Sequence, residues 1–119
     1  VIGLGKLGLP MVACFASKGF TVVGVDLDPK KVTAANTGHS TNYEPGLKER
    51  LKACSGHLTA TQDTEAAVTS TDATFIVVPT PTDDNGSFST KYVISAAQDI
   101  GQAIKKKQWF HSFQLLQKS

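Results

Sequence analysis

The chain has few of the residues that mark specialised classes of protein: 119 residues include two cysteines, one tryptophan and one methionine. Cys14 and Cys54 form no CxxC pair, which fits a reducing compartment better than a disulfide scaffold, so we expect a cytoplasmic protein. There is no run of about 18 apolar residues, and the apolar start lacks the basic leader and cleavage site of a secretory signal. We therefore expect no membrane partner.

Positive charge is scarce outside the C-terminal end. Lys105, Lys106, Lys107 and Lys118 supply four of the 12 basic residues, and the remaining eight stand against ten acidic ones, so the body of the chain carries about −2. A nucleic-acid face requires lysine and arginine spread over one surface, usually with stacking aromatic residues. We expect no nucleic-acid partner.

What the chain does have is an alternation of short apolar runs and helical patterns. Strands are expected over residues 1–5, 21–25, 58–63 and 74–78. Helices are expected from about residue 7 to Gly19, from Pro29 to Thr37, from Pro45 to Cys54, over residues 64–70 and from Ser89 or Thr90 onward. This order predicts a single α/β domain, a doubly wound parallel sheet of the Rossmann-like type with helices on both faces.

Three of these helices have a predicted apolar face. The faces are Leu7, Met11, Cys14 and Phe15 in the first helix, Leu47, Leu51 and Cys54 in the third, and Val93, Ala96, Ala97, Ile100 and Ile104 in the last.

The opening stretch "VIGLGKLGLP" carries a Gly3-x-Gly5-x-x-Gly8 motif between an expected strand and helix. In a dinucleotide site the first glycine allows the tight turn, the second lets the main chain approach a pyrophosphate, and the third lets helix and strand pack closely. The helix N-terminus adds main-chain N–H donors for the phosphates. The motif in this context predicts a dinucleotide site.

Asp26 ends the next expected strand, at close to the spacing of about 20 residues that is typical of this fingerprint. A carboxylate there accepts both hydroxyls of the adenosine ribose and repels a 2′-phosphate, which favours NAD over NADP. The alternative is a solvated residue at a strand end, and for Asp28 before Pro29 we prefer a helix cap.

Five segments in order and spacing, "VIGLGKLGLP", "VVGVDLDPKKV", "NTGHSTNYEPGL", "LTATQD" and "FIVVPTPT", resemble the N-terminal NAD-binding domain of the nucleotide-sugar 6-dehydrogenases, which include the UDP-glucose and GDP-mannose enzymes. The resemblance runs from Val1 to about Ile104. We therefore divide the chain into an NAD-binding domain, residues 1–104, and a divergent basic and aromatic tail, residues 105–119. Trp109, Phe110 and Phe113 of the tail form either an exposed patch or an edge strand or interface piece.

The resemblance also implies which residues contact NAD. The pyrophosphate loop would be Gly3, Leu4, Gly5, Lys6, Leu7 and Gly8, the ribose contact Asp26, an accessory cation Lys31, and the lining towards the nicotinamide Val78, Pro79 and Thr80. For Thr80 and the following Pro81, an ordinary loop break remains the alternative.

The family's reaction, as the resemblance implies, oxidises the C6 alcohol of a nucleotide sugar to a carboxylate with two NAD, a step that serves polysaccharide biosynthesis. Its cysteine nucleophile lies in a GGxCxPKD-like segment, which is absent here. Cys14 and Cys54 are expected in the core, so we assign no catalytic residue. We expect the chain to bind NAD without turning over a substrate, and we interpret it as a truncated or frame-shifted product. Binding of a nucleotide sugar, or assembly into an oligomer, would require domains that these residues do not include.

Three alternatives remain open: a non-enzymatic NAD-binding module, a fragment of a β-hydroxyacid-type dehydrogenase, against which "YEPGL" argues, and a chain that does not fold stably alone. No metal site is expected, because Cys54 and His57 have no second pair nearby. Asp83 and Asp84, before Asn85 and Gly86, are interpreted as a solvated turn.

Overall fold

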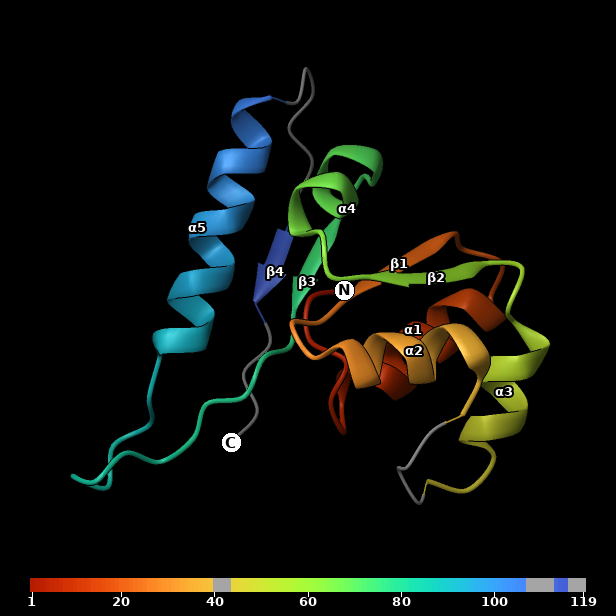
Figure 1. Cartoon of the computed structure of the whole chain (residues 1–119), viewed down its shortest axis with the longest axis horizontal. Coiled ribbons are helices and arrows are strands. Elements are labelled where there is room, and N and C mark those ends of the chain that lie inside the picture. The colour runs from red at the N-terminus through yellow and green to blue at the C-terminus, as the bar shows by residue number, and fades with distance from the viewer. Residues whose placement is uncertain (40–43, 107–112, 116–119) are drawn as a thin grey trace.

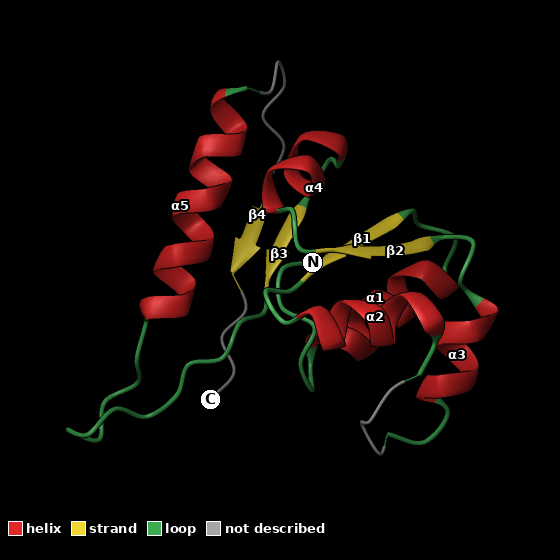
Figure 2. Cartoon of the chain, viewed as in Figure 1, coloured by secondary structure: helices red, strands yellow, loops and turns green. Residues whose placement is uncertain are grey.

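The computed structural model of the chain describes residues 1–39, 44–106 and 113–115. Its strands are β1 (Val22–Val25), β2 (Leu58–Thr61), β3 (Thr74–Ile76) and β4 (Phe113–Leu115). Its helices are α1 (Gly8–Ser17), α2 (Pro29–Thr37), α3 (Leu47–Ala53), α4 (Thr64–Ser70) and α5 (Lys91–Lys105), and Figure 2 shows these elements by type. None of the helices within these ranges has both the length and the apolar character that a membrane span requires.

The strands are parallel and lie in the order β2, β1, Ile2, β3, β4 (Figure 1). Ile2 is the central member, because it bridges both Val25 of β1 and Ile76 of β3. Its N–H donates to the carbonyl of Phe75 at 2.7 Å. The strand expected over residues 1–5 is therefore a single bridging residue, since the chain leaves the extended region at Gly3, where φ is 105°.

This strand order makes the sheet doubly wound, as predicted. From Ile2 the chain crosses to β1 and on to β2 in one direction, then returns to β3 on the other side of Ile2. In such sheets ligands bind beyond the carboxyl ends of the strands, where the winding reverses. The expected place for a site is therefore beyond the carboxyl ends of β3 and of the segment that contains Ile2.

Helices cover both faces of the sheet and enclose two apolar clusters. The cluster beneath α1, α2 and α3 contains Leu4, Leu9, Val12, Ala13, Ala16, Val22, Ala35, Leu47, Leu51, Cys54 and Leu58. The cluster beneath α4 and α5 contains Ile2, Val25, Ala67, Val68, Ile76, Val78, Ala96, Ile100 and Ala103. Val22 and Val25 of one strand belong to different clusters, because successive side chains of a strand point to opposite faces.

The predicted apolar face of α1 is wrong. Leu7 precedes the helix and is 43% exposed, Cys14 is also exposed, and Met11 and Phe15 are only partly buried. The buried side chains of the helix are instead those of Leu9, Val12, Ala13 and Ala16. The sequence "GLPMVACFAS" has small or apolar residues on every side, so its periodicity predicts a helix but not the face that packs on the sheet.

Cys14 therefore does not belong to the core, contrary to prediction. Its sulfur accepts a hydrogen bond of 3.4 Å from Nη1 of the exposed Arg50 on α3. Cys54, by contrast, is buried in the cluster beneath α3, and its thiol donates to the carbonyl of Leu51 at 3.6 Å.

Helix α3 begins later than predicted, at Leu47 rather than Pro45. The residue before it, Gly46, has a φ of 80°, so the chain turns there before the helix starts. In α5, Ala96 and Ile100 are buried as expected, but Ala97 is exposed and Ala103 takes its place in the core.

Two expected strands are longer than those observed. β2 ends at Thr61 and β3 at Ile76, although Val77 and Val78 stay buried beyond β3. A buried apolar run does not show where ladder pairing stops, because that depends on the neighbouring segment. Here Ile2 is the only residue of its segment that bridges β3 within the described part of the chain.

The predicted ends of α2 are confirmed. Asp28 is its N-cap and accepts a 2.9 Å hydrogen bond from the N–H of Lys30, while Pro29 occupies the first turn. Gly38 ends the helix with a φ of 71°, a conformation that glycine adopts without a steric penalty.

At the C-terminal end, the backbone of β4 pairs in parallel with β3, with Thr74 opposite Phe113 and Ile76 opposite Leu115. Trp109 and Phe110, which the sequence singled out, lie outside the described residues, as do Lys107 and Lys118.

Candidate functional site

The glycine motif forms a tight loop between Ile2 and α1, and two of its glycines are fixed by close main-chain contacts. A Cβ on Gly3 would collide with the carbonyl oxygen of Val77, and one on Gly8 would collide with that of Gly3. A Cβ on Gly5 would meet nothing within 4 Å. Gly3 and Gly8 are therefore required by the fold, whereas Gly5 borders open space.

Asp26 joins this loop to the end of β1. Its Oδ2 accepts a hydrogen bond of 2.8 Å from the N–H of Leu4, and its Oδ1 accepts one of 2.9 Å from the N–H of Asp28. The carboxylate is half-buried and held by main-chain donors on both sides. Because each carboxylate oxygen accepts more than one hydrogen bond, both still have capacity for a ligand.

Two cavities meet at Asp26. The smaller, of about 80 Å³, lies over the glycine loop, and the larger, of about 260 Å³, extends from the end of β1 towards α5. Both are lined by Gly3, Asp26, Lys31, Val78 and Pro79. The carboxyl ends of β1 and β3 and the start of α2 thus form one continuous crevice where the winding of the sheet reverses.

Most of the residues singled out by the sequence come together in this crevice. The smaller cavity is lined by Gly3, Gly5, Lys6, Leu7, Asp26, Lys31, Val78 and Pro79, together with Val77. Three of the predicted residues, Leu4, Gly8 and Thr80, line neither cavity. Leu4 acts through its main-chain N–H while its side chain packs beneath α1, and Gly8 packs against Gly3.

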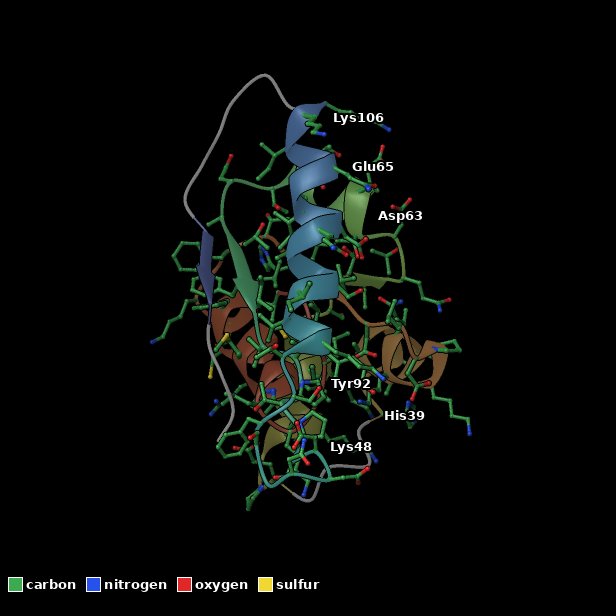
Figure 3. All side chains as sticks on the ribbon, turned by 90° about the vertical axis from the view of Figure 1, so that its left-hand side faces the viewer. His39, Lys48, Asp63, Glu65, Tyr92 and Lys106 are labelled. Atoms are coloured by element: carbon green, nitrogen blue, oxygen red, sulfur yellow. The ribbon has the colours of Figure 1, made fainter. Side chains whose placement is uncertain are left out.

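Sequence reasoning missed one wall of the larger cavity. Tyr92, Ser95, Ala96 and Asp99 of α5 line it, and Figure 3 shows Tyr92 near the start of that helix. The spacing of three and four residues places these side chains on one helical face. Of these four residues, only Ala96 belongs to the predicted apolar face of the helix, and the sequence gave no reason to expect a ligand beside the neighbouring polar side.

The sequence raised two pairs as candidates for a cation site, Cys54 with His57 and Asp83 with Asp84. The part of the chain that the structure describes contains no group of three or more His, Cys, Asp or Glu side chains arranged to hold a metal ion. Burial raises the pKa of the Cys54 thiol, which disfavours the thiolate that a metal requires. Oδ1 of Asp83 accepts hydrogen bonds of 3.0 Å from the N–H groups of Asn85 and Ser87, which confirms a turn.

Comparison with known proteins assigns this geometry to a family. Residues 1–111 match the model of the UDP-glucose/GDP-mannose dehydrogenase family, NAD binding domain. The UDP-glucose 6-dehydrogenase AglM of Haloferax volcanii is 38% identical over 112 residues, which are 93% of this chain and 26% of that protein. GDP-mannose 6-dehydrogenase of Pseudomonas aeruginosa is 35% identical over 114 residues, 94% of this chain and 26% of that protein.

Solved structures agree with this assignment. A ternary complex of GDP-mannose dehydrogenase from Pseudomonas aeruginosa superposes with a TM-score of 0.96 at 33% identity, covering 99% of this chain and 28% of that one. UDP-glucose dehydrogenase from Pyrobaculum islandicum superposes with a TM-score of 0.92 at 39% identity, and the match covers 98% of this chain and 27% of that one. The chain spans about a quarter of the length of these relatives. It belongs to the UDP-glucose/GDP-mannose dehydrogenase family, of which it is the N-terminal, NAD-binding domain.

Proposed function

We propose that residues 1–104 hold NAD in the crevice around Asp26 and present its nicotinamide end for oxidation of a nucleotide sugar. The contacts would come from Gly3, Leu4, Gly5, Lys6, Leu7 and Gly8 to the pyrophosphate, from Asp26 to the adenosine ribose, from Lys31 as a nearby cation, and from Val78, Pro79 and Thr80 as lining. The observation that carries the proposal is the carboxylate of Asp26, fixed by Leu4 and Asp28 at the junction of two cavities.

The glycine loop suits a pyrophosphate. The space beside Gly5 is open, so a phosphate group can approach the main chain there without meeting a side chain. No side chain caps the first turn of α1, where Leu7 is the N-cap residue. Leu9 of this turn donates to the carbonyl of Gly5, and Pro10 has no N–H. The N–H groups ahead of Leu9 and the positive end of the helix dipole therefore favour an anion in the smaller cavity.

Asp26 supports a preference for NAD over NADP. Its two oxygens can accept the ribose hydroxyls, whereas a 2′-phosphate would place a like charge beside a carboxylate that two main-chain donors hold in position. Lys31 lines both cavities, so it supplies a cation near the phosphates without displacing Asp26.

Bound NAD supplies a hydride acceptor for the alcohol carbon at C6 of the sugar. This chain's own residues contribute binding and orientation. Cys14 and Cys54 line neither cavity, and Cys54 is a buried thiol. Neither cysteine is therefore placed to attack a substrate beside the cofactor, and we propose that these 119 residues alone bind NAD without turnover. Free cysteines suit a reducing compartment, for which we propose the cytoplasm.

The test combines a binding and a turnover measurement on the purified chain. Calorimetric titration with NAD should give one binding site. The same protein mixed with NAD and UDP-glucose, or with NAD and GDP-mannose, should produce no reduced cofactor. Absence of NAD binding by a natively folded chain would contradict the proposed binding role, and turnover of either sugar would contradict the proposal that catalysis needs further residues.

A further inference from the structure

The larger cavity continues beyond Asp26 and is closed on one side by α5. The end of β1 and the start of α2 supply Val25, Leu27 and Asp28 to its lining, and α5 supplies Tyr92, Ser95, Ala96 and Asp99. Figure 1 shows α5 and the start of α2 on either side of the carboxyl end of β3. Any group attached to a ribose at Asp26 therefore has this space available to it.

The following inference rests on the proposed function. With the ribose at Asp26 and the pyrophosphate over the glycine loop, the purine base enters the larger cavity. Apolar side chains there, such as Val25, Leu27 and Val78, provide surfaces for the faces of a base. Such contacts accept any purine, because every base has a similar apolar face. Discrimination between purines must come from polar groups at the base edge.

The polar side chains of the lining differ in what they can select. The hydroxyls of Thr64, Tyr92 and Ser95 both donate and accept hydrogen bonds, so they suit an amino group and a carbonyl equally well. An ionised carboxylate only accepts. Among the lining residues, carboxylates are found at Asp26, Asp28 and Asp99.

Two of these three carboxylates already have main-chain partners. Asp26 accepts from Leu4 and Asp28, and Asp28 accepts from Lys30 as the cap of α2. Asp99 comes from α5, and no other described residue forms a hydrogen bond or ion pair with its carboxylate. Because Asp26 is assigned to the ribose and Asp28 caps α2, Asp99 is the carboxylate of this lining that is left for a donor from the base edge.

We propose that Asp99 is a specificity residue, which accepts a hydrogen bond from the exocyclic amino group of adenine and disfavours a dinucleotide whose base carries a carbonyl at that position. Comparing the binding of two dinucleotides, NAD and nicotinamide hypoxanthine dinucleotide, tests this proposal. They share both riboses, the pyrophosphate and the nicotinamide. They differ at one edge of the base, where adenine has an amino group and an unprotonated N1 and hypoxanthine has a carbonyl and an N1–H.

The experiment measures the dissociation constants of both dinucleotides by calorimetry for the wild-type chain, Asp99→Asn and Asp84→Asn. Asparagine has the shape of aspartate but donates as well as accepts, so it no longer distinguishes the two bases. Asp84 is an exposed carboxylate that lines neither cavity, so its variant controls for the loss of one negative charge. A substitution that changes how the pyrophosphate is bound alters both dissociation constants equally, so their ratio is unaffected by it.

We expect the wild-type chain and Asp84→Asn to bind NAD about fivefold to tenfold more tightly than the hypoxanthine analogue. This is less than a buried hydrogen bond to a charged group contributes, because Asp99 is exposed. Asp99→Asn should reduce the ratio to less than about twofold. Equal binding of both dinucleotides by the wild-type chain, or an unchanged ratio in Asp99→Asn, would overturn the inference and leave the proposed function standing. Failure of the folded wild-type chain to bind NAD would overturn both.

Discussion

The N–H of Leu4 donates a 2.8 Å hydrogen bond to Oδ2 of Asp26, so the residue that follows the first glycine of the loop is tied to the residue that follows β1. The same carboxylate accepts from Asp28, where α2 begins. One side chain thus links the glycine loop, a strand and a helix. Positioning of the cofactor site and stability of the domain depend on the same group.

The first prediction concerns this dual role. In Asp26→Asn, the amide nitrogen must face one of the two main-chain N–H donors, and that donor loses its acceptor. We expect the free energy of unfolding to fall by about 1–3 kcal/mol. Urea denaturation followed by circular dichroism measures it. Asp84→Asn, which changes an exposed loop residue, should stay within about 0.5 kcal/mol of the wild-type chain.

The glycines of the loop should separate into two classes. Gly3→Ala places a Cβ against the carbonyl of Val77 at a positive φ, so the free energy of unfolding should fall by at least about 2 kcal/mol. Gly5→Ala adds a methyl group to open space at an ordinary φ and should leave stability within about 1 kcal/mol. If the methyl group occupies the phosphate position, NAD affinity in Gly5→Ala should fall about tenfold or more.

Thermal melts and NAD titrations of both variants check this separation. A destabilised Gly5→Ala would show that this glycine is needed for the fold rather than for a ligand. A Gly5→Ala chain that binds NAD as tightly as the wild-type chain would place the pyrophosphate elsewhere.

Asn36 provides a test of how α2 is attached to the sheet. Its side chain both donates to the carbonyl of Ala60 at 3.0 Å and accepts from the N–H of Ala60 at 2.8 Å, so it pairs with β2 as a neighbouring strand would. Asn36→Ala should lower the free energy of unfolding by about 1–2 kcal/mol. Thr33→Ala, an exposed change on the same helix, serves as the control, and equal stability of the two variants would contradict a role for the pairing.

The two cysteines should differ in reactivity. Cys14 is exposed, whereas Cys54 is buried, and burial raises the pKa of the Cys54 thiol. Because the thiolate is the nucleophile, Cys54 should remain protonated and unmodified at neutral pH while iodoacetamide alkylates Cys14. Mass spectrometry of the digested protein distinguishes the two sites. Faster labelling of Cys54 would show that the α3 region opens readily.

Burial of Cys54 also gives a pH dependence with a definite sign. A thiol whose pKa is raised in the folded state binds its proton more tightly there than in the unfolded chain. Its contribution to stability is therefore complete below the unfolded pKa and is lost as the pH rises through the folded one. Unfolding measured at increasing alkaline pH should show this loss in the wild-type chain and not in Cys54→Ala.

Much of the fold follows from local sequence signals. The cap at Asp28, the end of α2 at Gly38 and the helix over residues 64–70 depend on neighbouring residues, and all three were predicted correctly. The buried face of α1 depends on which side meets the sheet and α3, which periodicity cannot decide in a helix that is apolar on all sides. For the same reason Cys14 was placed in the core and is exposed.

In the candidate site, too, the features that depend on neighbouring residues were predicted and those that depend on distant packing were not. Asp26 and the glycines were identified because their spacing reports the local turn, the helix start and the strand end. The wall formed by Ser95 and Asp99 was missed, because it depends on how α5 returns across the end of β3 after a long connection. Nothing in the residues around Asp99 indicates that the helix approaches the end of β1.

The preference for NAD over NADP tests the central claim most directly, because it depends on a negative charge at Asp26 beside the ribose. We would titrate the wild-type chain and Asp26→Asn with both dinucleotides by calorimetry, after circular dichroism shows that each is folded. The wild-type chain should bind NAD at least about tenfold more tightly than NADP, and Asp26→Asn should lose most of that preference. Equal affinity of the wild-type chain for both, or an unchanged preference in folded Asp26→Asn, would contradict the account.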